Sequence, residues 1–501
     1  MKRIFSSSVV ALAAGLGLRL FFVLKYPASS GDTILYEQIA TNWLKHHVYA
    51  MDVGGAVTPV DLRMPGYPAF LVIVYALTGR TGADARLWVM LAQIWVDLLG
   101  CLVIARLAEL LTATSEGTPT NQHVRSVALW LAVLCPFTAN YCAVALTEVF
   151  AVFWTALACC GVVVTLRRIE KPDFLLKASH RPLGRSAEYP ALGAGLAVGM
   201  GTLFRPETPL LLFAAVVLFG GLLFRLQDFK RWVMVSLAMG LGCLMVLSPW
   251  AIRNLITLGE PQFLAPKNSN LPGELVPYGF MAWEKTWLYR VKDCYLVPWK
   301  LNDESIDVEQ IPGRAFDTAE EKQRVAGILE QYNTDLTLTA EEDQEFGALA
   351  RERTARHPLR TNVWLPAARA ATIWFTPRIE LVPVSGHVFP LRQTREDDPV
   401  DQEITIGFFV LNLLYVGLGL WGAVWLWRSN SGGRPLVAFL VLYIVLRTAF
   451  LTTLETPEPR YVLVCFPALI AMGAQVFAGR AVHWQEKLPF TLLLLTLKSH
   501  R

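Results

Sequence analysis

The chain has 501 residues, of which 54% are hydrophobic and only 17% are charged, and its mean hydropathy is +0.40. Soluble domains carry about 25% charged residues, so this composition excludes an ordinary soluble enzyme and favours an all-α polytopic membrane protein. The net charge of +4 is spread over separate loops, which argues against a nucleic-acid partner. The eight cysteines contain no CxxC pair, so they predict neither a disulfide framework nor a zinc site.

Ten segments along the chain have the length and apolar content of spanning helices, which need about 20 residues. They cover residues 8–25, 87–106, 124–143, 146–167, 189–204, 207–225, 232–250, 403–427, 435–453 and 460–479. The first segment follows Lys2 and Arg3 and imitates a signal peptide, but the many later spans favour a retained anchor. A further apolar run over residues 65–78 is only about 14 residues long, which predicts an interfacial or re-entrant helix.

The placement of lysine and arginine decides the predicted topology, because these residues mark cytoplasmic loops. If residues 65–79 do not span, every short basic loop lies on the cytoplasmic side, whereas the later basic loops face outward if this segment spans. The first arrangement puts both termini inside and the loop 26–86 outside. We therefore predict a transmembrane catalytic module over residues 1–250, an outside, mostly helical loop region over 251–402, and C-terminal transmembrane helices over 403–501.

Polar side chains gather where the predicted spans meet the outside. The acids are Asp32, Glu148 and Glu207, and the basic and aromatic members are Arg63, Arg205, Arg253, Arg460, Tyr36, Tyr67 and Tyr461. Ionisable groups cost about 2.5–3.5 kcal/mol each at the centre of a spanning helix, and less at its ends. They therefore often mark function or face a watery cavity, and this gathering predicts a site at the outer membrane face.

Each of these residues also has a structural interpretation. Asp32 is a suitable N-cap for a helix over residues 33–44, and Glu148 is suited to the first turn of a helix, where the dipole favours an acid. Arg205 and Arg253 are equally well read as interfacial anchors that extend towards water. Solvation at the surface explains Arg63 as well as any specific role does, and Tyr36 and Tyr67 suit an interfacial aromatic belt. The prediction of a site therefore rests on the whole set.

Acids and arginines at one membrane face point to a particular chemistry. A desolvated carboxylate acts as a general base near neutral pH. The planar guanidinium of arginine pairs bidentately with phosphate oxygens. Together they suit a lipid-linked phosphate substrate, in which the phosphate leaves and the carboxylate activates an incoming hydroxyl.

Several short motifs follow one another in a characteristic order. They are Gly31-Asp-x-x-x-Tyr36-x-x-x-Ala40, Arg63-x-Pro-Gly-Tyr-Pro68, Leu146-Thr-Glu148, Phe204-Arg-Pro-Glu207, Pro249-Trp-x-x-Arg-Asn254 and Arg460-Tyr-Val-Leu-x-x-x-Pro467. In these motifs the chain resembles the polytopic class C glycosyltransferases of the family 39 type, which include the bacterial relatives of protein O-mannosyltransferases and the lipid A aminoarabinose transferase. The resemblance runs from the first predicted span to the last.

The resemblance implies a donor of the form polyprenyl-phosphate-sugar, used at the outer face of the cytoplasmic membrane. The acceptor would be a hydroxyl of a protein, a lipid or a polysaccharide, and the reaction a single inverting displacement. Asp32 would be the base and Glu148 a second carboxylate of the active site. The predicted contacts to the donor phosphate are Arg63, Arg205, Arg253 and Arg460, with Tyr36, Tyr67, Glu207 and Tyr461 as further site candidates.

No cofactor is predicted with certainty. Some members of the class use a divalent metal and others do not. A metal is not favoured here, because Glu148 has no adjacent Asp-x-Asp or Asp-x-Glu.

Two other functions stay open at this point. A transporter or flippase of a lipid-linked glycan would share the membrane class, although such proteins often carry inverted repeats and broken spans at the midplane. The sequence shows no repeat, and its acids lie at span ends. A noncatalytic relative is the other alternative, which the presence of both Asp32 and Glu148 disfavours.

Overall fold

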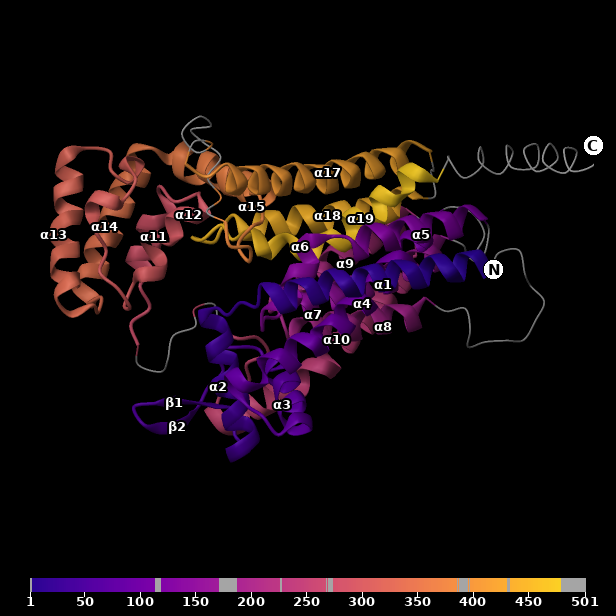
Figure 1. Ribbon diagram of the computed structural model, residues 1–501, viewed down its shortest axis with the longest axis horizontal. Coiled ribbons are helices and arrows are strands. Elements are labelled where there is room, and N and C mark those ends of the chain that lie inside the picture. The colour runs from indigo at the N-terminus through magenta and orange to yellow at the C-terminus, as the bar shows by residue number, and fades with distance from the viewer. Residues whose placement is uncertain are drawn as a thin grey trace, which may run out of the picture. The chain divides into compact units, whose positions relative to one another are not determined.

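The structure, a computed structural model, forms two compact units (Figure 1). It describes residues 2–112, 119–170, 187–225, 228–266, 274–384, 397–429 and 433–478, together with residues 268, 386 and 395. Unit 1 comprises residues 1–265, 379–444 and 463–501, and unit 2 comprises 266–378 and 445–462. Most of the basic loop between the predicted spans 146–167 and 189–204, namely residues 171–186, and the tail from 479 to 501 lie outside the described residues.

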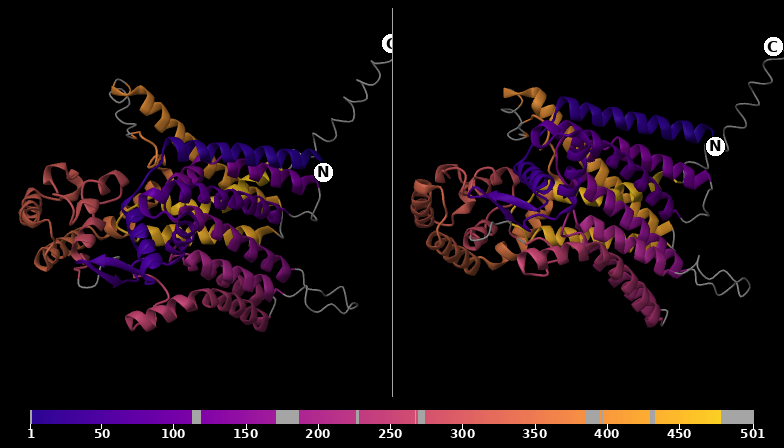
Figure 2. Two further views of the ribbon diagram at one scale, coloured as in Figure 1. Left: turned by 60° about the horizontal axis from the view of Figure 1, so that its bottom comes forward. Right: turned by 90° about the horizontal axis from the view of Figure 1, so that it is seen from below.

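Unit 1 consists mainly of long helices that run side by side (Figures 1 and 2). These helices are α1 (Lys2–Lys25), α4 (Arg86–Leu111), α5 (Pro119–Val133), α6 (Pro136–Ala139), α7 (Glu148–Glu170), α8 (Glu188–Thr202), α9 (Pro209–Arg225), α10 (Phe229–Leu258), α17 (Pro399–Ser429), α18 (Arg434–Leu451) and α19 (Phe466–Gly473). The last of them is flanked by 3₁₀ turns, Pro459–Cys465 and Ala474–Phe477. The last residues of α18 and most of the first of these turns belong to unit 2.

Most of the predicted spans correspond to long apolar helices. Within the described residues, seven helices are long and apolar enough to cross a membrane, and a bent pair, Asn121–Val133 with Pro136–Ala143, makes an eighth if counted as one span. The chain is therefore a multi-pass membrane protein. The remaining two expected spans, 189–204 and 207–225, form the shorter helices α8 and α9, of 15 and 17 residues. The count of ten spans stays a prediction.

Small residues bring α8 against its neighbour α10. A Cβ added to Gly195 would lie 1.9 Å from the carbonyl oxygen of Met239, and one added to Gly242 would lie 2.4 Å from that of Leu192. Close backbone approach through glycine is a common way of packing helices in membranes, where no hydrophobic effect drives them together. The contact holds the end of α8, and hence Arg205, in a fixed place beside α10.

A buried ion pair joins α1 to α4. Arg19 Nε donates to Asp97 Oδ2 at 2.6 Å, and Arg19 Nη1 donates to the carbonyl oxygens of Gly15 and Val133 at 2.9 and 2.7 Å. Both charged side chains are buried. Because the pair satisfies several polar groups within a spanning region, it fixes the helix that leads into the loop carrying Asp32.

The loop after α1 holds two short helices and a hairpin. They are α2 (Gly31–His46), β1 (Ala50–Val53), β2 (Ala56–Pro59) and α3 (Gly66–Thr78). The two strands pair antiparallel, Ala50 opposite Pro59, and they gather with α2 and α3 at one end of the long helices (Figure 1). The predicted short apolar helix is α3, which has 13 residues and ends where Gly79 adopts a left-handed conformation.

Unit 2 is a small helical unit with an aromatic core. Its helices are α11 (Tyr278–Lys285), α12 (Val291–Cys294), α13 (Ala319–Asp335), α14 (Ala340–Arg356) and α15 (Leu365–Phe375). Phe280, Trp283 and Phe346 pack together with ring centroids 5.0–5.8 Å apart.

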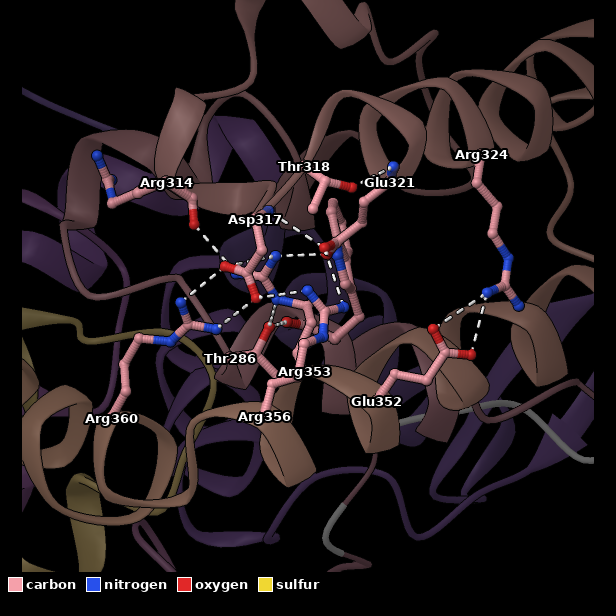
Figure 3. A network of polar contacts seen from close by, with 11 residues as sticks. Thr286, Arg314, Asp317, Thr318, Glu321, Arg324, Glu352, Arg353, Arg356 and Arg360 are labelled. Carbon is pink, nitrogen blue, oxygen red and sulfur yellow. Dashed lines mark hydrogen bonds and ion pairs between the residues drawn. The ribbon is translucent and has the colours of Figure 1, made fainter.

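Ion pairs reinforce unit 2 at one side of α14. Arg353 is buried and pairs with Glu321, and Arg360 donates to Asp317 at 2.7 and 3.0 Å (Figure 3). Arg356 contacts the same two carboxylates at 3.2 and 3.3 Å. Because three guanidinium groups surround it, the pKa of Asp317 lies below its usual range, the hydrogen bond from Arg360 being the largest cause.

Candidate active site

Asp32 lies in the first turn of α2 and pairs with Arg63. Arg63 Nη2 donates to Asp32 Oδ1 at 2.8 Å, and both side chains are partly exposed. The N-cap interpretation of Asp32 is wrong, because Ser30 caps this helix: its side chain accepts from the backbone N–H of Thr33, and the Thr33 hydroxyl accepts from the backbone N–H of Ser30. The Asp32 carboxylate is therefore directed to an arginine from a different segment.

Glu148 and Arg205 form a second ion pair. Glu148 is the first residue of α7 and only 3% exposed, and its Oε1 accepts from Arg205 Nη2. Glu207 lies next to the same guanidinium, 3.9 Å from Nη1. Glu148 therefore lies in the first turn of a helix, where the helix dipole favours an acid. Its carboxylate also meets a basic group from the turn between α8 and α9.

Tyr36 lies in α2 one turn after Asp32, so the two side chains share one side of that helix. The pKa of Tyr36 is raised to about 12, and burial is the largest cause; Asp32 and Glu148 also raise this pKa, while Arg63 and Arg205 lower it. All four charged groups therefore act on one phenol. The phenol stays protonated at neutral pH, so it is able to donate a hydrogen bond to an oxygen at this place.

Aromatic rings form the packing beneath this charged group. The Tyr36 and Tyr67 rings meet edge to face at 5.1 Å, and Phe150 stacks on Phe204 at 4.7 Å. Tyr67 and Phe150 are 6.0 Å apart. Because Phe150 and Phe204 lie two residues after Glu148 and one before Arg205, their stacking keeps those charged residues together.

Gln93 positions the segment that leads into Glu148, and the sequence analysis missed it. This glutamine is fully buried in α4; it accepts from the Tyr67 hydroxyl at 2.7 Å and donates to the carbonyl oxygens of Val144 and Cys142 at 2.9 and 3.3 Å. A side-chain amide within the expected span 87–106 was the available signal, since buried polar groups require partners.

Further contacts fix the same segment from the side of α2. The backbone N–H of Ala28 donates to the carbonyl of Ala143 at 2.8 Å, and the Thr33 hydroxyl donates to that of Ala145 at 3.2 Å. Arg86 holds α2 to α4 through two hydrogen bonds to Glu37, of 2.6 and 2.8 Å.

Gly66 brings the Arg63 loop against the end of α8. Its backbone N–H donates to the carbonyl oxygen of Leu203 at 2.8 Å, and an added Cβ would lie only 2.6 Å from that oxygen. Only glycine allows this approach, and it fixes the spacing between the loop of Arg63 and that of Arg205.

Arg253 contacts the two residues that flank the hairpin, Tyr49 and Val60. It donates to the carbonyl oxygens of Val60 and Tyr49 at 2.8 and 2.7 Å, and its guanidinium lies 5.2 Å from the ring centres of Tyr49 and Trp250. A cavity of about 450 Å³ adjoins it, with lining residues that include Trp43, Pro65, Gly66, Leu203 and Pro249.

Arg460 and Tyr461 belong to unit 2. Arg460 pairs with Glu458, and the Tyr461 hydroxyl donates to the same carboxylate at 3.0 Å. Among the described residues, no cluster of three or more histidines, cysteines or acids is arranged to hold a metal ion.

Solved structures provide the comparison, since no family model and no curated protein matches the chain. The oligosaccharyltransferase of Archaeoglobus fulgidus in its apo form superposes with a TM-score of 0.52 at 11% identity, over 98% of this chain and 52% of that one. The chain has the class C glycosyltransferase fold. It spans about half the length of the oligosaccharyltransferase.

Looser matches are also found to ArnT from Cupriavidus metallidurans. The form bound to undecaprenyl phosphate is 13% identical and covers 93% of this chain and 77% of its own, with a TM-score of 0.37. At such identities the likeness to a class C glycosyltransferase concerns the fold. The roles of individual residues therefore have to be argued from their own contacts.

Proposed function

We propose that this membrane protein is a glycosyltransferase that moves a sugar from a polyprenyl-phosphate-linked donor to an acceptor hydroxyl. The observation that carries the proposal is the pair of carboxylate–arginine contacts, Asp32 with Arg63 and Glu148 with Arg205. The class C fold supports a transferase of this kind.

The two arginines are suited to hold the donor phosphate. In the resting protein each guanidinium pairs with a carboxylate, so an entering phosphate offers it a second anionic partner of matching geometry. Asp32 and Arg63 are partly exposed, which leaves this pair open to exchange. As Arg63 turns to the phosphate, Asp32 is released to accept a proton.

Asp32 then serves as the general base. The acceptor hydroxyl gives its proton to Asp32, and its oxygen forms the new bond to the anomeric carbon of the sugar. The bond from that carbon to the phosphate oxygen breaks at the same time, and polyprenyl phosphate leaves with the electron pair. A single displacement of this kind inverts the anomeric configuration and forms no covalent glycosyl-enzyme.

Glu148 and Tyr36, which are both buried, assist the displacement of the phosphate. Glu148, with Glu207 nearby, holds Arg205 in place for the leaving phosphate. Protonated Tyr36 donates a hydrogen bond to the phosphate or to Asp32. Arg253 donates to backbone carbonyls that flank the hairpin and lines the adjoining cavity, and it stays a candidate contact for the donor phosphate.

The proposed orientation puts this site on the outer face of the cytoplasmic membrane. The support is the distribution of lysine and arginine: with α3 not spanning, the short basic loops fall on the opposite side. The same argument gives ten spans, with α8 and α9 among them, and both termini in the cytoplasm.

Detergent micelles have no two sides between which a lipid can be moved, so an assay in micelles detects a transferase but not a flippase. The full-length protein in detergent micelles is given a panel of polyprenyl-phosphate hexoses and pentoses with cell-envelope acceptors, and release of free polyprenyl phosphate is followed. The proposal expects release that depends on the acceptor and a glycosylated product of inverted configuration. A flippase has no chemical product in micelles, so intact donor across the whole panel would overturn the proposal.

A further inference from the structure

Unit 2 has a polar groove where α11 packs against α14. A Cβ added to Gly279 would lie 1.8 Å from the carbonyl oxygen of Asp343, so the two helices touch at their backbones. Beside this contact lies a cavity of about 720 Å³, a volume within the range of small-ligand sites. Its lining includes Thr361 and Asn362, which belong to a π turn, Arg360–Trp364. Single π turns of this kind occur frequently at functional sites.

The lining of this groove offers many hydrogen bonds and little apolar surface. Its apolar residues are small, apart from the exposed ring of Tyr278, and they are Gly279, Ala282, Gly347, Ala350 and Ala355. The remaining lining residues carry hydroxyl, amide or charged groups. Such a lining suits a ligand that is dense in hydroxyl groups, because each polar group of the groove then finds a partner.

Arg351 supplies a cation that is available to a ligand. Its side chain is exposed and lines the groove, and its Nη1 would lie 3.5 Å from a Cβ added to Gly347. No ion pair or hydrogen bond joins this guanidinium to any residue that the structure describes. A carboxylate pairs bidentately with the planar fork of an arginine, so Arg351 favours an acidic ligand.

The single acid of the groove does not cancel this charge. The Asp343 carboxylate accepts from the backbone N–H groups of Gly279 and Phe280 at 3.0 and 2.9 Å, so both its oxygens have partners. Lys285 adds a second cation to the lining, and it also pairs with Glu455 at 3.0 Å. Positive charge therefore prevails where a ligand would lie.

The hydroxyl of Thr361 is a separate sign of a ligand. Its oxygen is buried and has no hydrogen-bond partner among the described residues. Buried polar atoms nearly always have a partner, and a hydroxyl of a bound ligand would provide one here. Gln344 and Asn362, both exposed, add two amide groups to the same lining.

We propose that this groove of unit 2 binds an acidic saccharide, a sugar chain that carries carboxylates. Arg351 pairs with a carboxylate of the chain, and the sugar hydroxyls exchange hydrogen bonds with Thr361 and the two amides. The ring of Tyr278, which is 64% exposed, offers a flat surface to the C–H face of a sugar. A peptide is a poorer fit, because peptide recognition in a groove uses pockets for apolar side chains.

The proposed saccharide site is separate from the candidate active site. Both carboxylate–arginine pairs of that site lie in unit 1, whereas all the lining residues of the groove lie in unit 2. The inference therefore does not depend on the chemistry proposed above.

The experiment measures the binding of defined ligands to the full-length protein in detergent. Trigalacturonate, an acidic trisaccharide, is titrated, and its dissociation constant is obtained by saturation-transfer NMR. Maltotriose (neutral and of the same length), triglutamate (an acidic peptide) and inorganic phosphate are the comparison ligands. Arg351→Gln removes the cation of the groove. Lys292→Gln, at an exposed position of α12 outside the groove, is the control with the same loss of charge.

The proposal expects trigalacturonate to bind more tightly than the three comparison ligands. Arg351→Gln should raise its dissociation constant about ten- to a hundredfold, and Lys292→Gln should leave it near that of the wild type. Ala355→Trp, which fills the groove from an exposed position, should also abolish this binding, and it replaces Arg351→Gln if that variant unfolds.

Three results would overturn the proposal. The first is a wild-type protein that does not bind trigalacturonate. The second is equal binding by the groove variants and Lys292→Gln, because the saccharide would then lie elsewhere. The third is a comparison ligand that binds as tightly as trigalacturonate, because the groove would then recognise neutral sugars, acidic peptides or any anion.

Discussion

Arg63 Nη2 donates a hydrogen bond of 2.8 Å to Asp32 Oδ1, across 31 positions of sequence. The proposed base is thus paired, at rest, with the residue proposed to bind the donor phosphate. Glu148, at the start of α7, and Arg205, in the turn between α8 and α9, form a second pair of the same kind. In the proposed mechanism Arg63 exchanges the carboxylate for the donor phosphate, which joins donor binding to the release of Asp32 as a base, while Glu148 keeps Arg205 in place.

Replacing Arg63 should weaken donor binding and slow the reaction together. A hydrogen bond to a charged group contributes about 1.5–3 kcal/mol, so Arg63→Gln should lower kcat/KM for the donor about ten- to a hundredfold. Arg63→Lys keeps the charge without the bidentate fork and should recover part of the loss. Steady-state kinetics with varied donor measures both. Unchanged KM and kcat in Arg63→Gln would remove this residue from the site.

Alanine at Gly66 should disturb the site through the backbone. Its Cβ would come within 2.6 Å of the Leu203 carbonyl, and overpacking of this kind costs about 1–3 kcal/mol. Gly221→Ala in α9 is the control, because an added Cβ there meets nothing within 4 Å. We expect a lower unfolding temperature and lower kcat for Gly66→Ala and neither for Gly221→Ala, with thermal unfolding in detergent as the measurement. Equal melting of the two variants contradicts this.

The buried pair of Arg19 and Asp97 should show strong coupling. Removing one partner leaves a buried charge uncompensated, which costs about 3–5 kcal/mol. Arg19→Met alone should therefore be much less stable than the double variant Arg19→Met/Asp97→Leu, in which both charges are gone. A double-mutant cycle on denaturant unfolding measures the difference. Additive effects would mean that the two charges do not interact.

Glu284 should make unit 2 less stable as the pH rises. Burial, and then the neighbouring Glu455, raise the pKa of Glu284 well above its usual value. A carboxyl whose folded pKa lies above its unfolded value favours folding in its protonated form, and that stability is lost as pH rises above about 4.3 towards the folded pKa. Glu284→Gln cannot ionise, so it should be more stable than the wild type at neutral pH.

Thermal unfolding of the full chain between about pH 5 and pH 8 measures this effect. The wild type should lose stability across that range relative to Glu284→Gln. Glu345→Gln, at an exposed position, should follow the wild type. If the Glu284→Gln curve also runs parallel to the wild type, the carboxyl is not held protonated.

The sequence predicts which candidate residues lie at the ends of spans. It does not predict which hydrogen-bond partners their side chains have. Hydropathy alone is enough to place Asp32 and Glu148 at the ends of apolar segments. The short length of residues 65–78 and the placement of lysine and arginine then predict that both acids lie on the same side of the membrane. The cap of α2 depended on whether the helix begins after Ser30 or after Asp32, a choice made by local geometry. The position of Arg253 in its motif does not predict that it donates to the carbonyl oxygens of Val60 and Tyr49.

Gln93 illustrates the other limit of the sequence. It binds Tyr67 and the segment before Glu148, and these lie 26 to 51 positions away. Such a link depends on the packing of three segments at once. Periodicity along one helix shows only that a polar group is buried and must have partners.

The most direct test of the proposed mechanism is the turnover of Asp32→Asn. Purified full-length protein in nanodiscs is given the polyprenyl-phosphate sugar and acceptor that the wild type uses, and release of polyprenyl phosphate is timed. General base catalysis contributes about 10²- to 10⁴-fold, so the variant should lose at least about a hundredfold in kcat. Its unfolding temperature and its affinity for polyprenyl phosphate should stay near those of the wild type. A folded Asp32→Asn protein that turns over at the wild-type rate would contradict the assignment of Asp32 as the base.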